Sequence, residues 1–314
     1  MKTKVIGIGD NVCDKYYPAK IMYPGGQAMN FSVYAKMLGA DAAYMGVFGR
    51  DEVADHVIRT LDELGVDHSR CRQYDGENGY AKVRLVDGDR EFIMSNKGGI
   101  VNEHPLELTK EDLDYIRTFK LIHTSCNGHL DGELHKLREA GVPISYDMSG
   151  RWNQEYYIET IGPQVDIAFA SCGDTPEEEI KKLCEALKAR GCRMTVATRG
   201  GKGSLIYDGE QYYTQKPKLV DGYSGSRRFL CHSLSAGHAG EEGYPCGHGS
   251  GSRVCGKDVP GERRVWPRHR LPGRINEKSH IFLNPRQAGS PAFLLVAAGI
   301  LFYLTCHFDC FILE

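Results

Sequence analysis

The segment KVIGIGDNVCD (residues 4–14) is followed by YPGGQAMNFSVYAKMLG (residues 23–39), and these two segments together indicate the fold class. Residues 4–9 are a short apolar run that predicts a buried strand, and residues 29–38, after the glycine pair, predict a helix. A strand followed by a helix is the unit from which parallel α/β sheets are built. We therefore expect an α/β protein.

The alternation of strands and helices continues toward residue 198. Apolar runs predict further strands at 42–47, 121–124, 144–147, 165–170 and 194–198, and amphipathic stretches predict helices at 52–64, 109–117, 132–140, 154–161 and 176–190. Short alternating runs at 71–74, 80–86 and 91–94, with a turn at 86–89, interrupt this order. The sequence thus predicts a doubly wound, mostly parallel sheet with a small β lid over about 71–98.

The amino-acid composition changes after residue 221. Residues 1–221 contain 28 basic and 34 acidic side chains and all eight methionines, whereas residues 222–314 contain 11 basic and 7 acidic side chains and no methionine. The second part is rich in Gly, Arg, Ser and Pro and has no apolar period, so it cannot easily bury a core face. We expect one incomplete domain over 1–221 and an aberrant, disordered tail over 222–314 that is not native-like.

The overall composition excludes several classes of protein. A chain of 314 residues with 25% charged and 41% hydrophobic residues is typical of a soluble globular protein, and its net charge of −2 does not favour nucleic acid or an anionic membrane. Its 11 cysteines lack paired CxxC spacing, and from the strand-like run at residues 4–9 we expect no signal peptide. The apolar run at 292–304 is shorter than the ~20 residues that span a bilayer. We expect a cytoplasmic protein that acts on a small molecule.

Eight separated blocks between residues 3 and 221 indicate a family. They are GIGDNVCDKY (7–16), YPGGQAMNFSVYAKMLG (23–39), GVFGRDEVADHV (46–57), VNEHPLELTKEDL (101–113), LIHTSCNGHL (121–130), SYDMSGRW (145–152), VDIAFAS (165–171) and VATRGGKGSLIYDG (196–209). In these blocks the chain resembles the ribokinase/PfkB family of carbohydrate kinases, most closely its fructoselysine 6-kinase branch. The resemblance implies a ribokinase-like fold and a kinase that uses ATP and Mg²⁺ to phosphorylate the 6-hydroxyl of a fructosamine sugar.

The resemblance also implies a sugar site around the first strand and helix. Open α/β sheets bind ligands at the carboxyl ends of their strands, where Asp10, Asn11 and Asp14 are expected. By resemblance Asp14 binds sugar hydroxyls, whereas Asp10 is either a second ligand or a turn residue. The remaining predicted sugar-binding residues are Gly25, Gly26 and Asn30, because glycines let the backbone approach a ligand closely and Asn30 lies one helical turn further on.

Three other positions carry the phosphate chemistry that the resemblance implies. Arg151, in SYDMSGRW, is either a bidentate phosphate contact or an ordinary surface arginine. Thr198, Gly200 and Gly203 resemble the strand and turn that hold the nucleotide, and GGKGS is not a Walker loop. Glu178 is our choice for a water-mediated Mg²⁺ contact, although acidic residues at 177–179 also suit a helix N-terminus.

One motif that the family requires is missing from the chain as written. The family's glycine-rich anion hole and its general-base aspartate should follow Asp221, but residues 222–230 read GYSGSRRFL. When the permitted codons of residues 222–231 are read one base later, they allow Asp-Thr-Ala-Gly-Ala-Gly-Asp-Ser-Phe. The same shift allows Ser-Gly-Ala-Phe-Gly-His-Gly at 262–268 and a stop codon at 274–276. We infer a one-nucleotide frameshift at or just before codon 222.

The sequence leaves three hypotheses for function open. The first is a fructosamine 6-kinase that is inactive as written, because no catalytic base can be identified. The second is a catalytically dead protein that binds a sugar, and the third is a kinase for another sugar such as fructose or a ketodeoxy acid. The expected partners are small-molecule sugars or sugar amines, without nucleic acid or membrane, and a homodimer through the lid is an additional hypothesis.

Overall fold

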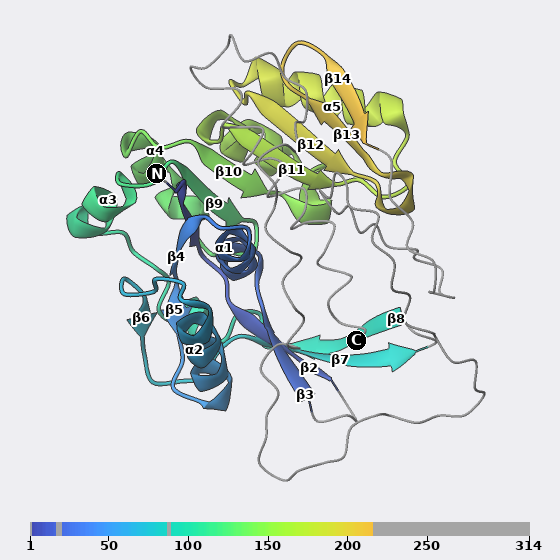
Figure 1. Ribbon diagram of the computed structural model, residues 1–314. Coiled ribbons are helices and arrows are strands. Elements are labelled where there is room, and N and C mark those ends of the chain that lie inside the picture. Colours follow the sequence, from blue (N-terminus) through green and yellow to red (C-terminus); the bar gives the residue numbers. More distant parts are fainter. Residues whose placement is uncertain (1, 17–20, 87–88, 216–314) are drawn as a thin grey trace, which may run out of the picture.

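The computed structural model describes residues 2–16, 21–86 and 89–215 (Figure 1). The predicted tail at 222–314, the missing motif and its frameshift lie outside the described residues. The turn predicted at 86–89 falls largely on residues 87–88, which are not described either, although the strands on both sides of it pair antiparallel.

The main sheet has eight strands in the order β14-β13-β12-β11-β10-β9-β1-β4. In chain order its strands are β1 (Lys4–Ile8), β4 (Asp41–Met45), β9 (Leu121–Ser125), β10 (Ile144–Asp147), β11 (Ile167–Ser171), β12 (Met194–Thr198), β13 (Ser204–Tyr207) and β14 (Tyr212–Gln215). All neighbours from β4 to β12 are parallel, and β13 and β14 are antiparallel additions at one edge. The predicted mostly parallel α/β sheet is therefore confirmed.

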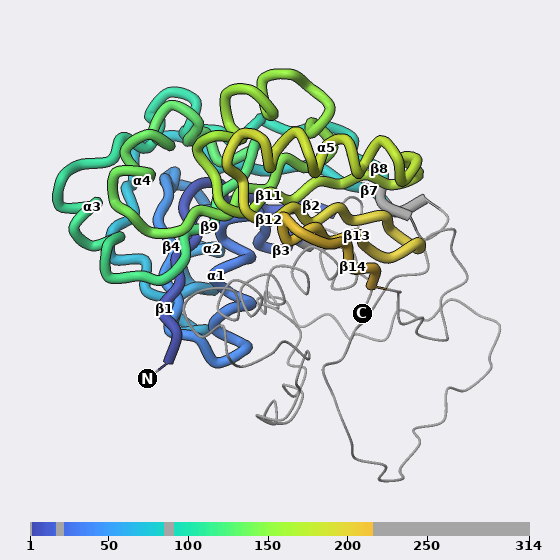
Figure 2. Tube along the Cα trace, turned by 90° about the horizontal axis from the view of Figure 1, so that it is seen from above, coloured from blue at the N-terminus to red at the C-terminus, as the bar shows by residue number. Residues whose placement is uncertain are grey.

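Helices pack on both faces of this sheet (Figure 2). They are α1 (Gln27–Met37), α2 (Glu52–Leu64), α3 (Lys110–Ile116), α4 (Leu134–Glu139) and α5 (Glu177–Ala189). Because side chains alternate across a strand, Leu121 belongs to the apolar cluster of Phe31 in α1, whereas Ile122 belongs to the cluster of Leu134 in α4 and Ile180 in α5. The strands are buried from both sides, as their near-continuous apolar sequences require.

Local sequence explains where α2 begins and ends. The Asp51 carboxylate accepts a hydrogen bond from Ala54 N at 2.9 Å and caps the first turn. Gly65 follows the last turn in the left-handed conformation, with φ 65°. These two signals lie in the sequence itself, so the predicted bounds 52–64 agree with those of the structure.

Short helical segments complete the connections. They are η1 (Ile100–Asn102), η2 (Asp131–Glu133), η3 (Ser149–Arg151), η4 (Tyr157–Ile161), η5 (Gly162–Gln164) and η6 (Gly200–Lys202). The helix predicted at 154–161 is realised as a helical segment over 155–161, which is α-helical at 155–156 and continues as the π-helical η4. None of the helices in the described ranges has the length and apolar character needed to cross a membrane.

The lid is a separate four-stranded sheet in the order β3-β2-β7-β8, set apart from the main sheet in Figure 1. Its strands are β2 (Val12–Tyr16), β3 (Ile21–Gly25), β7 (Tyr80–Val86) and β8 (Asp89–Ser95). Two of them precede the range 71–98 that the sequence predicts for the lid, because the charged residues of VCDKY hide the strand pattern. The run at 71–74 forms β6 (Arg72–Gln73), which pairs with β5 (Val47–Phe48) outside the lid.

Candidate active site

The candidate site lies where the carboxyl ends of central strands meet the start of α1. Asp10 follows β1, Ser125 is the last residue of β9, and Asp147 is the last residue of β10. Helix α1 begins at Gln27, directly after the lid strand β3. The polar ends of the sheet and the lid therefore come together at one edge, which is where open α/β sheets bind ligands.

Asp10 fixes the first turn of α1. Its carboxylate accepts hydrogen bonds from Gln27 N at 2.7 Å, from Ala28 N at 3.1 Å and from the Ser125 hydroxyl at 3.3 Å. Burial raises the pKa of this carboxyl, and the hydrogen bonds from Ala28 and Gln27 oppose that rise. Both oxygens are thus engaged in joining β1 to α1 and β9, which supplies a structural reason for an aspartate here. A sugar contact from Asp10 stays a prediction.

Asn11 is bound by protein groups on every side. Its amide nitrogen donates to the Tyr44 hydroxyl at 2.9 Å and to Val47 O at 2.8 Å, and its oxygen accepts from Asn78 Nδ2 at 2.9 Å. Only 6% of Asn11 is exposed. The side chain links the end of β1 to β5 and to the start of β7 by hydrogen bonds. Its role as a sugar ligand stays a prediction.

The two predicted glycines differ sharply in their surroundings. Gly26 has φ 110°, and a Cβ atom there would lie 2.6 Å from Asp10 O and 2.8 Å from Asn11 Cα. A Cβ atom on Gly25 would make only an ordinary contact of 3.8 Å with Val12 Cγ2. The backbone therefore requires glycine at 26 whatever the ligand, whereas the space at 25 would admit a methyl group.

Asn30 presents a buried acceptor near this corner. The residue is 5% exposed, and its Oδ1 has no hydrogen-bond partner among the described residues. A buried oxygen without a donor is costly and commonly marks a ligand or a water molecule. Asp14 lies on the lid strand β2, where it pairs with Tyr23 of β3 and Ala81 of β7 and is partly buried. Asp14 thus lies in the lid, two residues along β2 from Val12, which pairs with Gly25, whereas Asn30 lies in the first turn of α1.

A second polar group lies beside Asp10 and was only partly foreseen. Asp147 accepts from Gln27 Nε2 at 2.5 Å and from Ser149 N at 2.7 Å. Asn127 Nδ2 donates to Gln27 Oε1 at 3.3 Å, and Arg151 Nη2 donates to Asn127 Oδ1 at 3.1 Å. Burial raises the pKa of Asp147 to about 6, with a smaller contribution from the nearby Asp10. Gln27 and Asn127 were not predicted from the sequence, although Gln27 directly follows the glycine pair and Asn127 lies two residues after β9.

Arg151 lies in η3 and points across this group. Its Nη1 donates to Cys126 O at 3.1 Å and to the Tyr157 hydroxyl at 3.3 Å. The next residue, Trp152, donates from Nε1 to Ser171 O at 3.1 Å and so anchors the segment on β11. Arg151 is exposed and lies at the same sheet edge as Asp147. This position suits a phosphate contact, and the role of Arg151 in binding phosphate stays a prediction.

The predicted nucleotide turn joins β12 to β13. Gly200 and Gly203 both have positive φ, 52° and 88°, which glycine adopts readily. The Thr198 hydroxyl donates to Ala170 O at 3.4 Å, and two buried polar atoms beside the turn, Arg199 Nε and Ser204 Oγ, have no partner among the described residues. Such orphaned donors suit a polar ligand, so the fit of this turn to a nucleotide is favourable.

The segment of Glu178 is held mainly by ion pairs. Glu177 Oε2 lies 3.2 Å from Arg199 Nη1, which fastens α5 to the nucleotide turn. The Glu178 side chain is 82% exposed and lies 3.8 Å from Lys181 Nζ. Across the described part of the chain, no three His, Cys, Asp or Glu side chains converge as a metal centre. We therefore derive no step through a protein-bound metal, and the Glu178 assignment stays a prediction.

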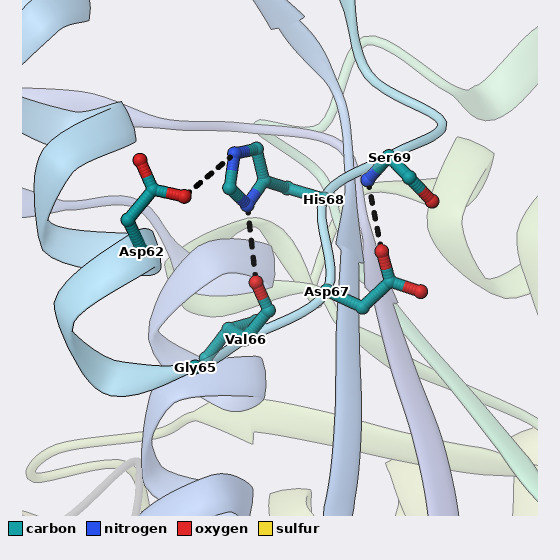
Figure 3. Close-up of a pocket in the computed structure, with 6 residues that line it drawn as sticks. All are labelled: Asp62, Gly65, Val66, Asp67, His68 and Ser69. Atoms are coloured by element: carbon teal, nitrogen blue, oxygen red, sulfur yellow. Dashed lines mark hydrogen bonds and ion pairs between the residues drawn. The ribbon is translucent and has the colours of Figure 1, made fainter.

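A shallow hollow at the end of α2 contains none of the predicted site residues (Figure 3). His68 Nδ1 lies 3.0 Å from Val66 O, and its Nε2 lies 3.6 Å from Asp62 Oδ1. Ser69 N donates to Asp67 Oδ1 at 3.0 Å. These polar groups bind one another and complete the connection from α2 to β6, so we place the candidate site at the sheet edge instead.

Comparisons with known proteins indicate the family of the chain. A profile described as pfkB family carbohydrate kinase matches residues 20–222. The chain is 36% identical to fructosamine kinase FrlD of Bacillus subtilis, over 74% of this chain and 83% of that protein. It is 28% identical to the fructoselysine 6-kinase of Escherichia coli, over 80% of this chain and 91% of that protein.

Solved structures share the fold. Arabidopsis thaliana ribokinase complexed with ribose and ATP superposes with a TM-score of 0.56 at 17% identity, covering 70% of this chain and 79% of that one. Fructokinase from Xylella fastidiosa with bound ATP gives a TM-score of 0.57 at 17% identity, covering 70% and 76%. The predicted ribokinase-like fold is confirmed for the described residues.

Proposed function

This chain belongs to the pfkB family of carbohydrate kinases, and on that premise we propose a fructosamine 6-kinase that uses ATP to phosphorylate fructoselysine or a related sugar amine. The likeness to fructosamine kinase FrlD, at 36% identity, supports the substrate class. The structural observation that supports the proposal most directly is the buried, unpartnered Oδ1 of Asn30. A sugar hydroxyl would donate the hydrogen bond that this oxygen lacks.

We assign the sugar and ATP to two different parts of the site. Asp14, Gly25, Gly26 and Asn30 would hold the sugar between α1 and the lid. The turn at 198–203 would hold ATP, with the positive-φ glycines allowing close approach and the orphaned Arg199 Nε and Ser204 Oγ supplying donors. ATP, bound with Mg²⁺, supplies the phosphoryl group.

The residues of this chain would contribute positioning and charge rather than covalent chemistry. Phosphoryl transfer depends mainly on alignment of the reactants and on donors directed at the transferred group. Arg151 offers such donors from the same sheet edge as Asp147, and the lid strands would exclude water from the sugar. Asp10 and Asn11 would hold the strand and helix ends in register through their protein contacts.

We propose further that the chain as written lacks turnover, because the frame changes at or just before codon 222. The pfkB profile match ends at residue 222, and that boundary supports the proposal. The general base and anion hole of the family would be encoded one base out of frame, beyond the described residues. The domain assignment of 1–221 with a non-native segment at 222–314 follows from the same proposal.

The first test is the DNA sequence across codons 215–280. A shifted frame that encodes Asp-Thr-Ala-Gly-Ala-Gly-Asp-Ser-Phe would support a broken or misread kinase gene. Kinase assays with fructoselysine, fructose and a ketodeoxy acid would then compare the chain as written with a frame-corrected chain. We expect ATP- and sugar-dependent turnover only in the corrected chain, fastest with fructoselysine. Robust turnover by the chain as written would contradict the proposed inactivity, and a preference for fructose would assign another substrate.

A catalytically dead sugar-binding protein is the second candidate. It is favoured by the fact that all the proposed sugar-binding residues, from Asp14 to Asn30, precede residue 222, where the frame is proposed to change. DNA without the hidden motif, together with sugar binding measured by calorimetry in the absence of turnover, would select this candidate over the kinase.

The proposed cellular setting is the cytoplasm, and the proposed assembly is a homodimer through the lid. All six described cysteines are unpaired thiols, in keeping with a reducing compartment. The outer lid strand β8 exposes Phe92, Ile93 and Met94 by 62%, 49% and 45%. Apolar side chains on an edge strand favour pairing with a second subunit. Sedimentation of the chain at several concentrations would test the dimer.

A further inference from the structure

Four polar side chains form a continuous series from the buried sheet edge to solvent. Asp147, at 5% exposed, accepts from Gln27 Nε2 at 2.5 Å. Gln27 Oε1 accepts from Asn127 Nδ2 at 3.3 Å, and Asn127 Oδ1 accepts from Arg151 Nη2 at 3.1 Å. Asn127 and Arg151 are exposed, so the series joins a buried carboxylate to a guanidinium at the protein surface.

The chemistry of the two ends fixes the direction of the two amides between them. An ionised carboxylate only accepts hydrogen bonds, and a guanidinium only donates them. Each carboxamide has one donating and one accepting side. Only one orientation of Gln27 and Asn127 satisfies all three contacts, so turning either amide would oppose two donors or two acceptors. Every hydrogen bond in the series therefore has its donor on the side toward Arg151 and its acceptor on the side toward Asp147. The ionisation of Asp147 thus determines how the amide next to Arg151 is oriented.

We propose that Gln27 and Asn127 form a hydrogen-bond relay that holds the Arg151 guanidinium in a position set by the Asp147 carboxylate. Gln27 and Asn127 are positioning residues in this proposal. The proposed use of Arg151 as a phosphate contact rests on the proposed kinase function, whereas the relay itself is a property of the ligand-free chain. Gln27 also donates its backbone N–H to Asp10 Oδ2 at 2.7 Å, so the relay starts from the same residue that opens α1.

The charge of Asp147 is sensitive to its neighbours. The groups that face it are Asp10 after β1, Cys126 after β9 and, through the relay, Arg151 from η3. Burial and Asp10 raise the pKa of Asp147 to about 6. A neutral Asp147 carboxyl can donate as well as accept, so it no longer fixes the direction of the Gln27 amide. Arg151 would then keep its Nη1 contacts with Cys126 O and the Tyr157 hydroxyl, but the orientation of its Nη2 partner Asn127 would no longer be fixed as the pH falls through about 6.

The test measures the pH dependence of thermal unfolding of the full chain between pH 5 and 8. Asp147→Asn identifies the part of the profile that belongs to this carboxyl. Gln27→Leu removes a donor to the carboxylate, so the Asp147 transition should move to higher pH by about half a pH unit. Asn127→Leu should move it in the same direction by less, because an unheld Gln27 amide donates to Asp147 only part of the time.

Asn127→Leu is the deciding variant, because it changes no charge and Asn127 does not touch Asp147. A through-space effect of Arg151 would leave the transition in Asn127→Leu where it is in the parent. The matched control is Asn102→Leu, which removes another exposed amide that binds backbone oxygens of Lys97 and Gly99. The relay is overturned if Asn127→Leu behaves like Asn102→Leu. If Gln27→Leu does not fold, the exposed Asn127 still gives the answer.

A calorimetric titration of the same full-length chains with inorganic phosphate separates the relay from the proposed function. We expect Asn127→Leu to weaken phosphate binding about three- to tenfold, approaching the loss in Arg151→Met, while Asn102→Leu matches the parent. If no chain binds phosphate while the pH transition still moves, the relay is supported and the phosphate role of Arg151 fails. If phosphate binds equally to the parent and to Asn127→Leu, the relay does not position Arg151.

Discussion

Replacing Gly26 with alanine should destabilise the fold far more than the same change at Gly25. At position 26 the new Cβ atom would lie 2.6 Å from Asp10 O and 2.8 Å from Asn11 Cα, at φ 110°. Strain at such a φ costs about 1–3 kcal/mol, and forcing a methyl group into packed backbone costs about as much again. Together these effects predict a loss of roughly 2–6 kcal/mol, a large fraction of the ~5–15 kcal/mol of a typical domain.

Gly25→Ala is the matched control, because it adds the same atom one residue earlier. Its Cβ atom would meet Val12 Cγ2 at 3.8 Å, an ordinary contact, so the stability should change by less than about 1 kcal/mol. Urea unfolding followed by circular dichroism would give the two midpoints. Sugar binding by Gly25→Ala would then report on the predicted close approach of the ligand without a folding defect. Equal midpoints for the two variants would refute the assignment of Gly26 to a backbone requirement.

Three further predictions concern buried polar groups. Burial lowers the pKa of His123 to about 3, so the fold is favoured most above pH 6.5, where the imidazole is neutral in both the folded and the unfolded chain. As the pH falls, the free energy of unfolding should decrease, by about 2 kcal/mol at pH 5. Unfolding of the parent and of His123→Gln between pH 5 and 8 would show whether this pH dependence of the free energy of unfolding belongs to His123. Asn30→Leu removes the unpartnered Oδ1, so thermal unfolding should occur at the same or a higher temperature while calorimetry shows loss of sugar binding; unchanged binding would exclude Asn30 from the sugar site. Tyr44→Phe removes the hydroxyl that donates to Gly9 O at 2.7 Å and accepts from Asn11, and should lower the urea midpoint by the equivalent of about 1–3 kcal/mol; a midpoint within error of the parent would mean that the two buried groups find other partners.

Local signals were sufficient for much of the main sheet and its helices. The strands β10 and β12 and the helix α2 have the bounds that the sequence predicts, because apolar runs and the Asp51 and Gly65 caps lie within the segments themselves. The strands β2 and β3 were not predicted, because the partly polar VCDKY becomes a strand only through pairing with β7. The short strands β13 and β14 were missed for a similar reason, since they form by antiparallel addition to β12.

The sequence predicted where the residues of the candidate site lie in the sheet, but it did not predict their hydrogen-bond partners. The sequence placed Asp10 and Asn11 at the correct sheet edge, because both follow an apolar strand. It could not show that Asn11 binds Asn78, which lies 67 residues away, or that Gln27 binds Asp147, which lies 120 residues away. Such pairs depend on the tertiary arrangement, and no local sequence pattern predicts them. The sugar, nucleotide and metal assignments of individual residues stay predictions.

The strand order of the main sheet has a consequence for how the protein emerges from the ribosome. The first two strands made, β1 and β4, pair with each other, β9 then joins the other side of β1, and from β9 to β14 each strand adds beside the one synthesised just before it. Domains commonly fold from the N-terminus during synthesis. A nascent chain of this topology never has to open a finished strand pair to admit a later strand, and from β10 onward each new strand adds at the strand made last.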